Sequence, residues 1–411
     1  MTEGPYKLPK GWRWVRLGEV AYRESKTIKP AEEPSKIFRY LGMEHLDAGQ
    51  WEEPIYVELE GAMIKSQAII FYPGMVLYGK LRPYLNKVVI PTVEGVASTE
   101  FVPLLTNNNF LIPEYLGAYL RSPFFVSYAS RNTSGSRQPR VQFGAFWDAL
   151  IPLPPISEQK RILERINDLF SRIREAKRLR QEAQQEAERL WQSVLADTFP
   201  KPGTKLPEGW QWVGLYEVCQ HKTGIWGPES SHPDQGLPII RSTEIEGFLI
   251  RPQTASIRIV SNDRIEAFKL EAEDILVNKS SGSAHLVGWP AIFEGSIEGK
   301  IFLFSNFMLR LRPNREKILG WFLLYYLHNP LARSVYLRAQ DTTSGLRNLR
   351  VNEFMKQLIP LPTLHEQHKI VAYLKRVYEK IQSLKEAQTQ TEAELQRLEQ
   401  AILDKAFRGE L

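Results

Sequence analysis

Two stretches rich in basic and amide side chains occur in each half of this 411-residue chain. They cover residues 78–87 and 131–140 in the first half, and 277–285 and 338–350 in the second. Arginine and lysine contact phosphates and guanine, asparagine and glutamine read adenine, and serine and glycine let the backbone approach closely. The mixture predicts contact with DNA, although a solvated basic loop would have the same composition. The predicted DNA-contacting residues are Lys80, Arg82, Tyr84, Lys87, Arg131, Arg137, Gln138, Arg140, Lys279, Ser281, Ser283, His285, Arg338, Gln340, Arg347, Asn348 and Arg350.

No sequence pattern supplies a catalytic centre. The chain contains neither a Gly-x-x-x-x-Gly-Lys-Ser/Thr phosphate loop nor a Gly-x-Gly-x-x-Gly dinucleotide turn, and no Asn-Pro-Pro-aromatic string of the amino-methyltransferase type. His365 and His368 lack the His-Glu-x-x-His spacing of a zinc site. A nuclease could be assembled from Pro233-Asp234 and Glu298-Gly299-Lys300, but such matches arise easily by chance. We therefore expect a non-catalytic chain without a metal site.

The chain contains one framework twice. Leu8-Pro-Lys-Gly-Trp-Arg-Trp-Val15 recurs 198 residues later as Leu206-Pro-Glu-Gly-Trp-Gln-Trp-Val213. Ile151-Pro-Leu-Pro154 recurs 208 residues later from Ile359, and Glu-Gln follows each copy. Two long strings in the same order and at nearly the same spacing indicate a duplication. The ends of the copies are alike and their middles differ, as expected for a shared structural frame whose two middle parts recognise different targets.

Two arginines in the divergent middle also match. Arg137 and Arg140 correspond to Arg347 and Arg350, each 210 residues later. For Arg137 and Arg347, a structural role near the base of the domain is as reasonable as a base contact.

A helical pattern follows each Ile-Pro-Leu-Pro string. Its apolar positions advance by alternate steps of four and three, which is the heptad of a coiled coil. The stretch from Ile162 to Val194 spans about 48 Å, longer than a domain of about 150 residues can cover. We therefore expect the two helices to pair with each other. The predicted seam residues are Ile162, Ile166, Leu169, Ile173, Leu190, Val194, Ile370, Leu374, Val377, Ile381, Leu384, Leu395, Leu398 and Ile402.

Antiparallel pairing of these helices suits the sizes of the seam residues. Ala183 would meet Ile381 and Ala187 would meet Val377, so that small side chains face large ones. Parallel pairing would instead leave a polar, underfilled middle. Antiparallel pairing would also bring the segment after Phe407 close to the first residues of the chain.

The remaining sequence predicts two globular domains of the α+β or mixed α/β class. Residues 67–72, 87–90 and 274–277 read as strands, and residues 115–120 and 320–327 read as helices. The net charge of +6 mildly favours an anionic partner. A single cysteine, Cys219, the absence of a signal-peptide pattern and the absence of a long apolar run predict a cytoplasmic protein without a membrane segment.

The duplicated strings resemble those of the specificity subunit of type I restriction–modification systems, over essentially the whole chain. The resemblance implies two target-recognition domains, residues 1–155 and 200–362, separated by two long antiparallel coiled-coil helices, residues 156–199 and 363–411, in a pseudo-twofold internal repeat. It implies double-stranded DNA with a bipartite, asymmetric site. It also implies assembly with two methyltransferase subunits, and with restriction subunits in the full complex of a prokaryotic cell. S-adenosylmethionine, ATP and magnesium would belong to those partners and not to this chain.

Three alternatives stay open at this point. The chain could be the recognition subunit of another phage-defence enzyme. It could be a coiled-coil scaffold that binds no DNA. A stand-alone nuclease or methyltransferase would cut or methylate DNA without partners, which we do not expect.

Overall fold

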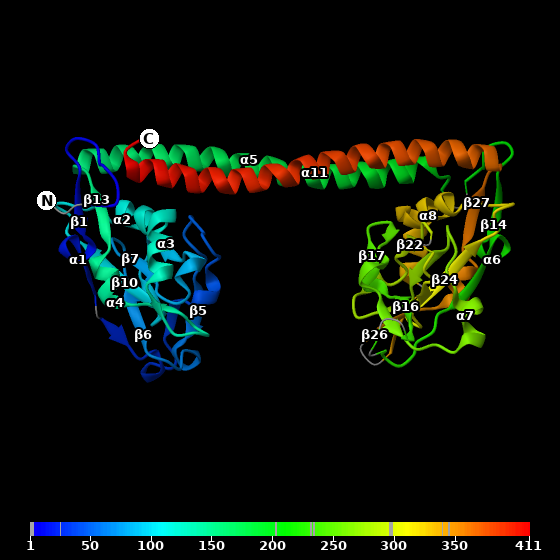
Figure 1. The fold of residues 1–411 in the computed structure, drawn as a ribbon, viewed down its shortest axis with the longest axis horizontal. Helices are drawn as coiled ribbons and strands as arrows, with labels where there is room; N and C mark the ends of the chain where they lie inside the picture. The colour runs from blue at the N-terminus through cyan, green and yellow to red at the C-terminus, as the bar shows by residue number, and fades with distance from the viewer. Residues whose placement is uncertain are drawn as a thin grey trace. The chain divides into compact units, whose positions relative to one another are not determined.

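The computed structural model describes residues 4–24, 26–201, 204–230, 232, 235–295, 299–338, 340–343 and 346–411. The chain divides into two compact units, residues 1–181 with 389–411 (unit 1) and residues 182–388 (unit 2). Each unit contains a globular part and segments of two long helices, α5 (Ile156–Thr198) and α11 (Leu364–Arg408) (Figure 1).

The globular part of unit 1 mixes sheets and helices. Its main sheets have the strand orders β2-β10-β7-β8, which is antiparallel, and β3-β6-β9-β4-β5, in which β4 and β9 pair in parallel. The strands are β1 (Arg13–Arg16), β2 (Ala21–Arg23), β3 (Thr27–Ile28), β4 (Ile37–Leu41), β5 (Val57–Glu60), β6 (Ala68–Phe71), β7 (Val76–Gly79), β8 (Val88–Val89), β9 (Gly95–Ser98), β10 (Phe101–Thr106), β11 (Thr133–Ser134), β12 (Arg140–Val141) and β13 (Leu150–Leu153). The helices are α1 (Leu17–Val20), α2 (Pro113–Leu120), α3 (Pro123–Arg131) and α4 (Phe143–Asp148).

The globular part of unit 2 repeats the strand order β2-β10-β7-β8 as β15-β24-β20-β22, but its other strands are arranged differently. Its sheets have the orders β15-β24-β20-β22-β18-β17, β19-β16-β23 and β21-β26-β25. The strands are β14 (Gln211–Gly214), β15 (Cys219–Thr223), β16 (Leu237–Ile240), β17 (Ile245–Glu246), β18 (Leu249–Ile250), β19 (Ser256–Arg258), β20 (Ile275–Asn278), β21 (Ser280–Ser281), β22 (Pro290–Ile292), β23 (Leu303–Phe304), β24 (Met308–Pro313), β25 (Gln340–Thr343), β26 (Leu346–Leu349) and β27 (Leu358–Leu361). The helices are α6 (Leu215–Val218), α7 (Asn262–Phe268), α8 (Gly320–His328), α9 (Pro330–Arg338) and α10 (Val351–Met355).

The two repeated strings are hydrogen-bonded to each other in both units. In unit 1, β1 pairs antiparallel with β13, so that Trp14 lies opposite Pro152. In unit 2, β14 pairs with β27 in the same way, and Trp212 lies opposite Pro360. The similarity is concentrated at the ends of each copy because those ends form one two-stranded ribbon, which leads directly into the long helix.

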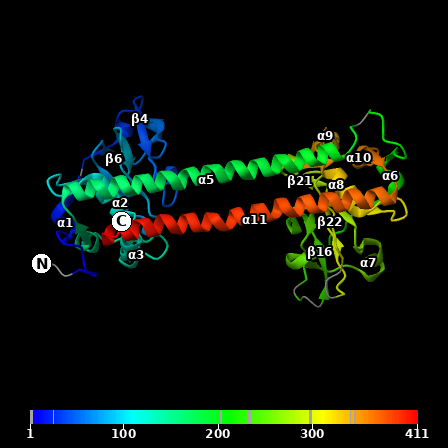
Figure 2. The same ribbon diagram turned by 90° about the horizontal axis from the view of Figure 1, so that it is seen from above.

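The long helices pack against each other in opposite directions within each unit (Figure 2). In unit 1, Lys177 pairs with Glu399 at 2.8 Å and Arg180 pairs with Glu392. In unit 2, Glu188 pairs with Lys385 at 2.8 Å. As the residue number rises in α5, that of its partner falls in α11. The antiparallel direction predicted from side-chain size is therefore confirmed.

The predicted layers of this helix pair are displaced. Because Glu188 pairs with Lys385, Ala187 lies roughly level with residue 386 and not with Val377. Ala183 is displaced from Ile381 by the same amount, about two and a half helical turns. In this register Ile402, Leu403 and Phe407 belong to the core of unit 1.

The buried face of α5 drifts away from the predicted heptad. Ile162, Ile166 and Ile173 are buried, but Leu190 is 55% exposed, and Trp191 takes its place. Ile173 and Trp191 are 18 residues apart, which is five turns of a straight α-helix. A straight helix moves by about 20° per heptad relative to a strict heptad. Over four heptads from Ile162 this drift approaches one residue, so the assignment of Leu190 to the seam is wrong.

The same drift operates in α11. Leu384 is 59% exposed and Leu398 is 48% exposed, so their seam assignments are wrong as well. The neighbouring residues Lys385 and Glu399 turn inward instead and form the ion pairs across the helices. Of the other predicted seam residues, Leu374, Ile381 and Ile402 are buried, and Leu169, Val194, Ile370, Val377 and Leu395 are partly buried.

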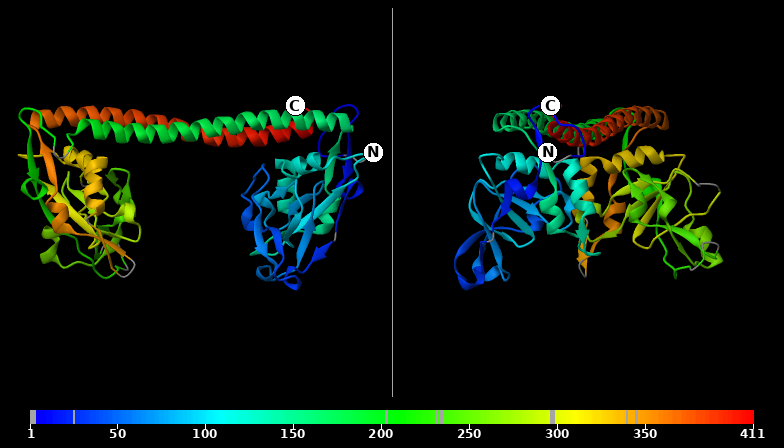
Figure 3. Two further views of the ribbon diagram at one scale, coloured as in Figure 1. Left: turned by 180° about the vertical axis from the view of Figure 1, so that it is seen from behind. Right: turned by 60° about the vertical axis from the view of Figure 1, so that its left-hand side comes forward.

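The N-terminal segment and the end of α11 pack together in unit 1 (Figure 3). The Tyr6 hydroxyl donates a hydrogen bond of 3.0 Å to the carbonyl oxygen of Phe407. The Phe407 ring lies 5.2 Å from Tyr115 and 5.1 Å from Tyr119, centroid to centroid. The proximity predicted from the sequence is confirmed.

Candidate nucleic-acid interface

The two polar segments of unit 1 lie side by side. Residues 80–87 form the hairpin loop between the antiparallel strands β7 and β8. Its first residues bridge to the second segment, because Leu81 lies opposite Arg140 and the amide of Val141 donates to the Lys80 carbonyl at 3.0 Å. The amide of Arg82 donates to the Pro139 carbonyl at 2.7 Å. Segments distant in sequence therefore form one surface.

Three of the predicted contact residues in unit 1 hold this surface together. The Lys80 ammonium donates to the Thr99 carbonyl at 2.7 Å, and the Lys87 ammonium donates to the Met43 carbonyl at 2.7 Å. The Arg140 guanidinium grips Glu100 with two hydrogen bonds of 3.0 and 2.8 Å, which lower the pKa of Glu100. The other predicted residues, Arg82, Tyr84, Arg131, Arg137 and Gln138, are exposed.

Unit 2 builds the corresponding surface from the loop between β20 and β22. Strand β21 in this loop pairs with β26, with Ser280 opposite Asn348 and Ser281 opposite Arg347. The amide of Leu349 donates to the Lys279 carbonyl at 2.8 Å, as that of Val141 does to Lys80 in unit 1. Both units therefore bring a hairpin loop and a second strand segment together by the same hydrogen bond.

The predicted residues of unit 2 also divide into supporting and exposed ones. Asn348 accepts a hydrogen bond of 2.5 Å from Ser280, and Gln340 donates to the Ala284 carbonyl at 3.2 Å. Arg350 pairs with Glu353 at 2.7 Å, and burial lowers the pKa of Lys279. Ser281 is partly buried, and its hydroxyl accepts from the amide of Ser283 at 3.1 Å. Ser283, His285, Arg338 and Arg347 are exposed.

The proposed match of Arg140 with Arg350 is wrong by two residues. Val141 and Leu349 make the same backbone hydrogen bond, so they are equivalent, 208 residues apart. Arg140 therefore corresponds to Asn348. Arg350 precedes α10 as Gln142 precedes α4. The repeated arginines do not mark equivalent places in the two units.

A buried glutamine fixes the start of each long helix to its globular part. The side-chain oxygen of Gln159 accepts from the Ile112 amide at 3.0 Å, and its nitrogen donates to the carbonyls of Phe110 and Pro154. Gln367 makes the equivalent bonds to the Leu319 amide at 2.9 Å and to the carbonyls of Lys317 and Pro362. Both side chains are fully buried. They are the glutamines of the repeated Glu-Gln string.

Each unit has a cleft between its globular part and its helix segments, which sequence reasoning missed. The cleft of unit 1 measures about 780 Å³ and is lined by Trp51, Arg121 and Phe170 among others. The cleft of unit 2 measures about 510 Å³ and is lined by Phe248, His328 and Tyr378 among others. Arg121 and His328 each stand two residues before the proline that begins the next helix, and this shared position is the signal that could have revealed them.

The two basic residues that line the clefts, Arg121 and His328, occupy equivalent positions but differ in their chemistry. The Arg121 guanidinium donates to the Val88 carbonyl at 2.6 Å, and burial lowers its pKa to about 10. His328 donates from Nε2 to the Pro290 carbonyl at 2.9 Å, and burial lowers its pKa from 6.5 to about 3. Unit 1 therefore buries a cation, whereas unit 2 buries a neutral imidazole.

Unit 2 should lose stability in mild acid because of His328. The unfolded chain binds a proton at His328 near pH 6.5, whereas the folded unit resists protonation until about pH 3. The contribution is fully present above pH 6.5 and declines by about 1.4 kcal/mol per pH unit as the pH falls through this window. We expect urea unfolding of the full chain at several pH values to show this slope, and His328→Gln to remove it. His221→Gln, at an exposed position, is the control that keeps the slope. An equal slope in His328→Gln would contradict the assignment.

Among the described residues, no group of three or more histidine, cysteine, aspartate or glutamate side chains could hold a metal ion. No helix in the described part of the chain is long and apolar enough to span a membrane. Pro233, Asp234 and Glu298, which the nuclease alternative would use, lie outside the described residues.

The structure thus contains one frame twice, and the two copies present different polar loop surfaces. The family model for the type I restriction modification DNA specificity domain matches residues 9–185 and 207–395. The chain belongs to this family.

Known relatives agree with this assignment. A solved chain from work on complex assembly and conformational transition of the type I R-M system is 33% identical, with a TM-score of 0.81 over 99% of this chain and 100% of that one. The HsdS subunit from Thermoanaerobacter tengcongensis is 35% identical, with a TM-score of 0.61 over 100% of both chains. The specificity subunit of the type I restriction enzyme EcoDI of Escherichia coli is 28% identical over 192 residues, which are 47% of this chain and 42% of that relative. This last match therefore spans less than half of the relative's length.

Proposed function

We propose that this chain is the non-catalytic DNA-recognition subunit of a type I restriction–modification enzyme, and that each unit reads one half of a bipartite, asymmetric sequence. The observation that carries the proposal is the pair of equivalent loop surfaces with different exposed side chains. Unit 1 exposes Arg82, Tyr84 and Gln138 on this surface, and unit 2 exposes Ser283, His285 and Arg347. Different side chains bond to different base edges, so the two half-sites differ.

The partners follow from the proposed class. Two methyltransferase subunits would supply methylation and bind S-adenosylmethionine, and restriction subunits would bind ATP and magnesium in the cytoplasm of a prokaryote. The chain itself would carry none of these cofactors. Its net charge of +6 suits a DNA partner.

The experiment that tests this function uses the chain assembled with its methyltransferase subunits. Replacing Arg82, Arg131, Arg137 and Gln138 by alanine should abolish discrimination in one half-site and leave the other unchanged. Equilibrium binding at several salt concentrations separates phosphate contacts from base contacts, because each lost phosphate contact reduces the salt slope by about 0.9. The control replaces Lys26 and Lys29, exposed in the same unit. A wild-type complex that prefers no sequence would refute DNA recognition and leave the scaffold alternative.

The two long helices, paired with each other, would set the spacing of the half-sites. Deleting seven residues from each, 180–186 and 386–392, removes about 10 Å of helix. We expect the spacer to shorten by about 3 base pairs, at 3.4 Å per step, with the bases of both half-sites unchanged. Mapping of methylated adenines measures this. Deletion from α5 alone, which mismatches the pair, is the control and should abolish methylation. An unchanged spacer in the double deletion would contradict the role of the helices.

A further inference from the structure

The hairpin loop of unit 1 has an unusual backbone. Its tip is a 3₁₀ turn, η4 (Pro83–Leu85), between two residues in the left-handed region, Arg82 with φ 49° and Asn86 with φ 51°. Asparagine tolerates this region, whereas for Arg82 the conformation costs about 1–3 kcal/mol. Such strain persists only where the surroundings impose it, and it concentrates at functional sites.

Four hydrogen bonds to other segments of unit 1 hold this loop in place. The Arg82 amide donates to the Pro139 carbonyl, and the Leu85 carbonyl accepts from the Gly49 amide at 3.0 Å. The Asn86 side chain donates to the Arg121 carbonyl at 3.1 Å, and Lys87 binds the Met43 carbonyl. These four bonds restrain the backbone of the loop on its own, without a ligand.

The anchored loop exposes an aromatic ring. Tyr84, in the middle of η4, is 56% exposed, whereas the neighbouring Pro83 is buried and Leu85 is partly buried. Arg82 is exposed beside it. Within the described part of the chain, neither side chain makes a hydrogen bond or an ion pair. A rigid aromatic contributes contact area at a low cost in conformational entropy.

Unit 2 places a different ring at the corresponding point. Its hairpin loop also carries a 3₁₀ turn, η8 (Ala284–Leu286), with the exposed His285 in the middle. The Ser283 that precedes η8 has an ordinary extended backbone with φ −106°. The strained, arginine-flanked tip is a property of unit 1.

We propose that Tyr84 is a specificity-determining residue, whose ring contacts one base pair of the half-site read by unit 1 while Arg82 contacts the adjacent DNA. This inference rests on the proposed function. The strained backbone fixes the position of the ring, so that a mismatched base pair loses the contact and the loop does not adapt. Tyr84 thereby selects one base pair of the target.

The test compares Tyr84→Ala and Tyr84→Phe in the chain assembled with its methyltransferase subunits. Affinities are measured for the methylation-mapped site and for every single-base variant of it. Tyr84→Ala should lose about 5- to 150-fold in discrimination at one position of one half-site. Tyr84→Phe keeps the ring and should retain most of that discrimination. Discrimination at the other half-site should be unchanged in both variants.

Tyr22 on β2 supplies a matched control. It is 57% exposed and belongs to the same unit, and Tyr22→Ala should leave every position unaffected. Equal discrimination by the wild type and Tyr84→Ala, or equal losses in Tyr84→Phe and Tyr84→Ala, would overturn the proposal. A wild-type complex without sequence preference would instead overturn the proposed function. Loss of discrimination at both half-sites in Tyr84→Ala indicates misfolding. Tyr84→Phe is then the deciding variant, and its loss of discrimination at one position would sink the proposal.

Discussion

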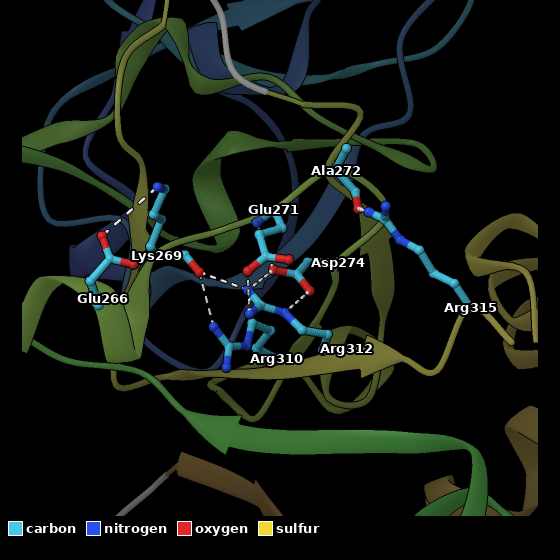
Figure 4. Close-up of polar contacts among 8 residues, drawn as sticks. All are labelled: Glu266, Lys269, Glu271, Ala272, Asp274, Arg310, Arg312 and Arg315. Carbon is cyan, nitrogen blue, oxygen red and sulfur yellow. Dashed lines mark hydrogen bonds and ion pairs between the residues drawn. The ribbon is translucent and has the colours of Figure 1, made fainter.

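Arg312→Leu is expected to lower the free energy of unfolding of unit 2 by about 3–5 kcal/mol. Arg312 binds both carboxylate oxygens of Asp274, at 2.8 and 2.7 Å, and also Glu271 and the Lys269 carbonyl (Figure 4). The Asp274 side chain is 1% exposed. Removal of the guanidinium leaves this buried carboxylate without its cation, which is the main cost of breaking such a pair.

Unit 1 indicates how the loss can be reversed. By strand pairing, Asp274 and Arg312 correspond to Met75 and Leu105, which pack in an apolar cluster. The double variant Asp274→Met with Arg312→Leu should therefore recover most of the lost free energy. A residual loss of about 1–3 kcal/mol is expected, because the Glu271 amide, which donates to Asp274, loses its acceptor.

Urea unfolding of the full chain measures both effects. Arg315→Leu is the matched control, since Arg315 is an exposed arginine close to this network that bonds to the Ala272 carbonyl. It should change stability by less than about 1 kcal/mol. A double variant as unstable as the single one would show that the pair is not interchangeable with its apolar counterpart.

Gln367→Leu should cost about 3 kcal/mol or more. The change leaves the buried Pro362 carbonyl, and the partly buried Leu319 amide and Lys317 carbonyl, without their partner. A fully buried unsatisfied group costs about 1–3 kcal/mol. Gln159→Leu should have the same effect in unit 1. Gln367→Glu should not rescue, because a carboxylate cannot donate to the two carbonyls.

Hydrogen exchange locates this effect. Loss of protection at the Leu319 amide is expected together with a lower unfolding free energy in urea. Gln396→Leu, at an exposed position of the same helix, is the control and should change stability by about 0.5 kcal/mol at most. Full protection of the Leu319 amide in Gln367→Leu would show that the glutamine does not anchor the helix.

Local patterns predicted the framework of this chain well. Helices at residues 115–120 and 320–327 and strands at 67–72 and 274–277 are confirmed within one or two residues by α2, α8, β6 and β20. The repeated strings revealed the duplication. Their pairing with each other was not predictable, because it joins residues about 140 positions apart.

The site was less predictable because side-chain partners are distant in sequence. Arg140 has the composition of a DNA-contacting residue, yet its guanidinium is engaged by Glu100, 40 residues away. Leu190 has the spacing of a seam residue, yet small angular differences accumulate along a helix. The clefts lined by Arg121 and His328 form where each globular part packs against its helix segments, so the sequence position of these two residues did not by itself indicate a cleft. Which exposed side chains contact bases remains a prediction.

The C-terminal residues of the chain complete unit 1, and this determines the order in which the two units can fold during synthesis. Unit 2 is one continuous stretch of residues, whereas unit 1 needs residues 389–411 to cover its core. The ribosome therefore synthesises all residues of unit 2 before it synthesises the segment of unit 1 that packs over Tyr115 and Tyr119. Until Phe407 emerges from the ribosome, these two rings lack their packing partner. Nascent chains would therefore depend on chaperones chiefly for the globular part of unit 1, although it is synthesised first.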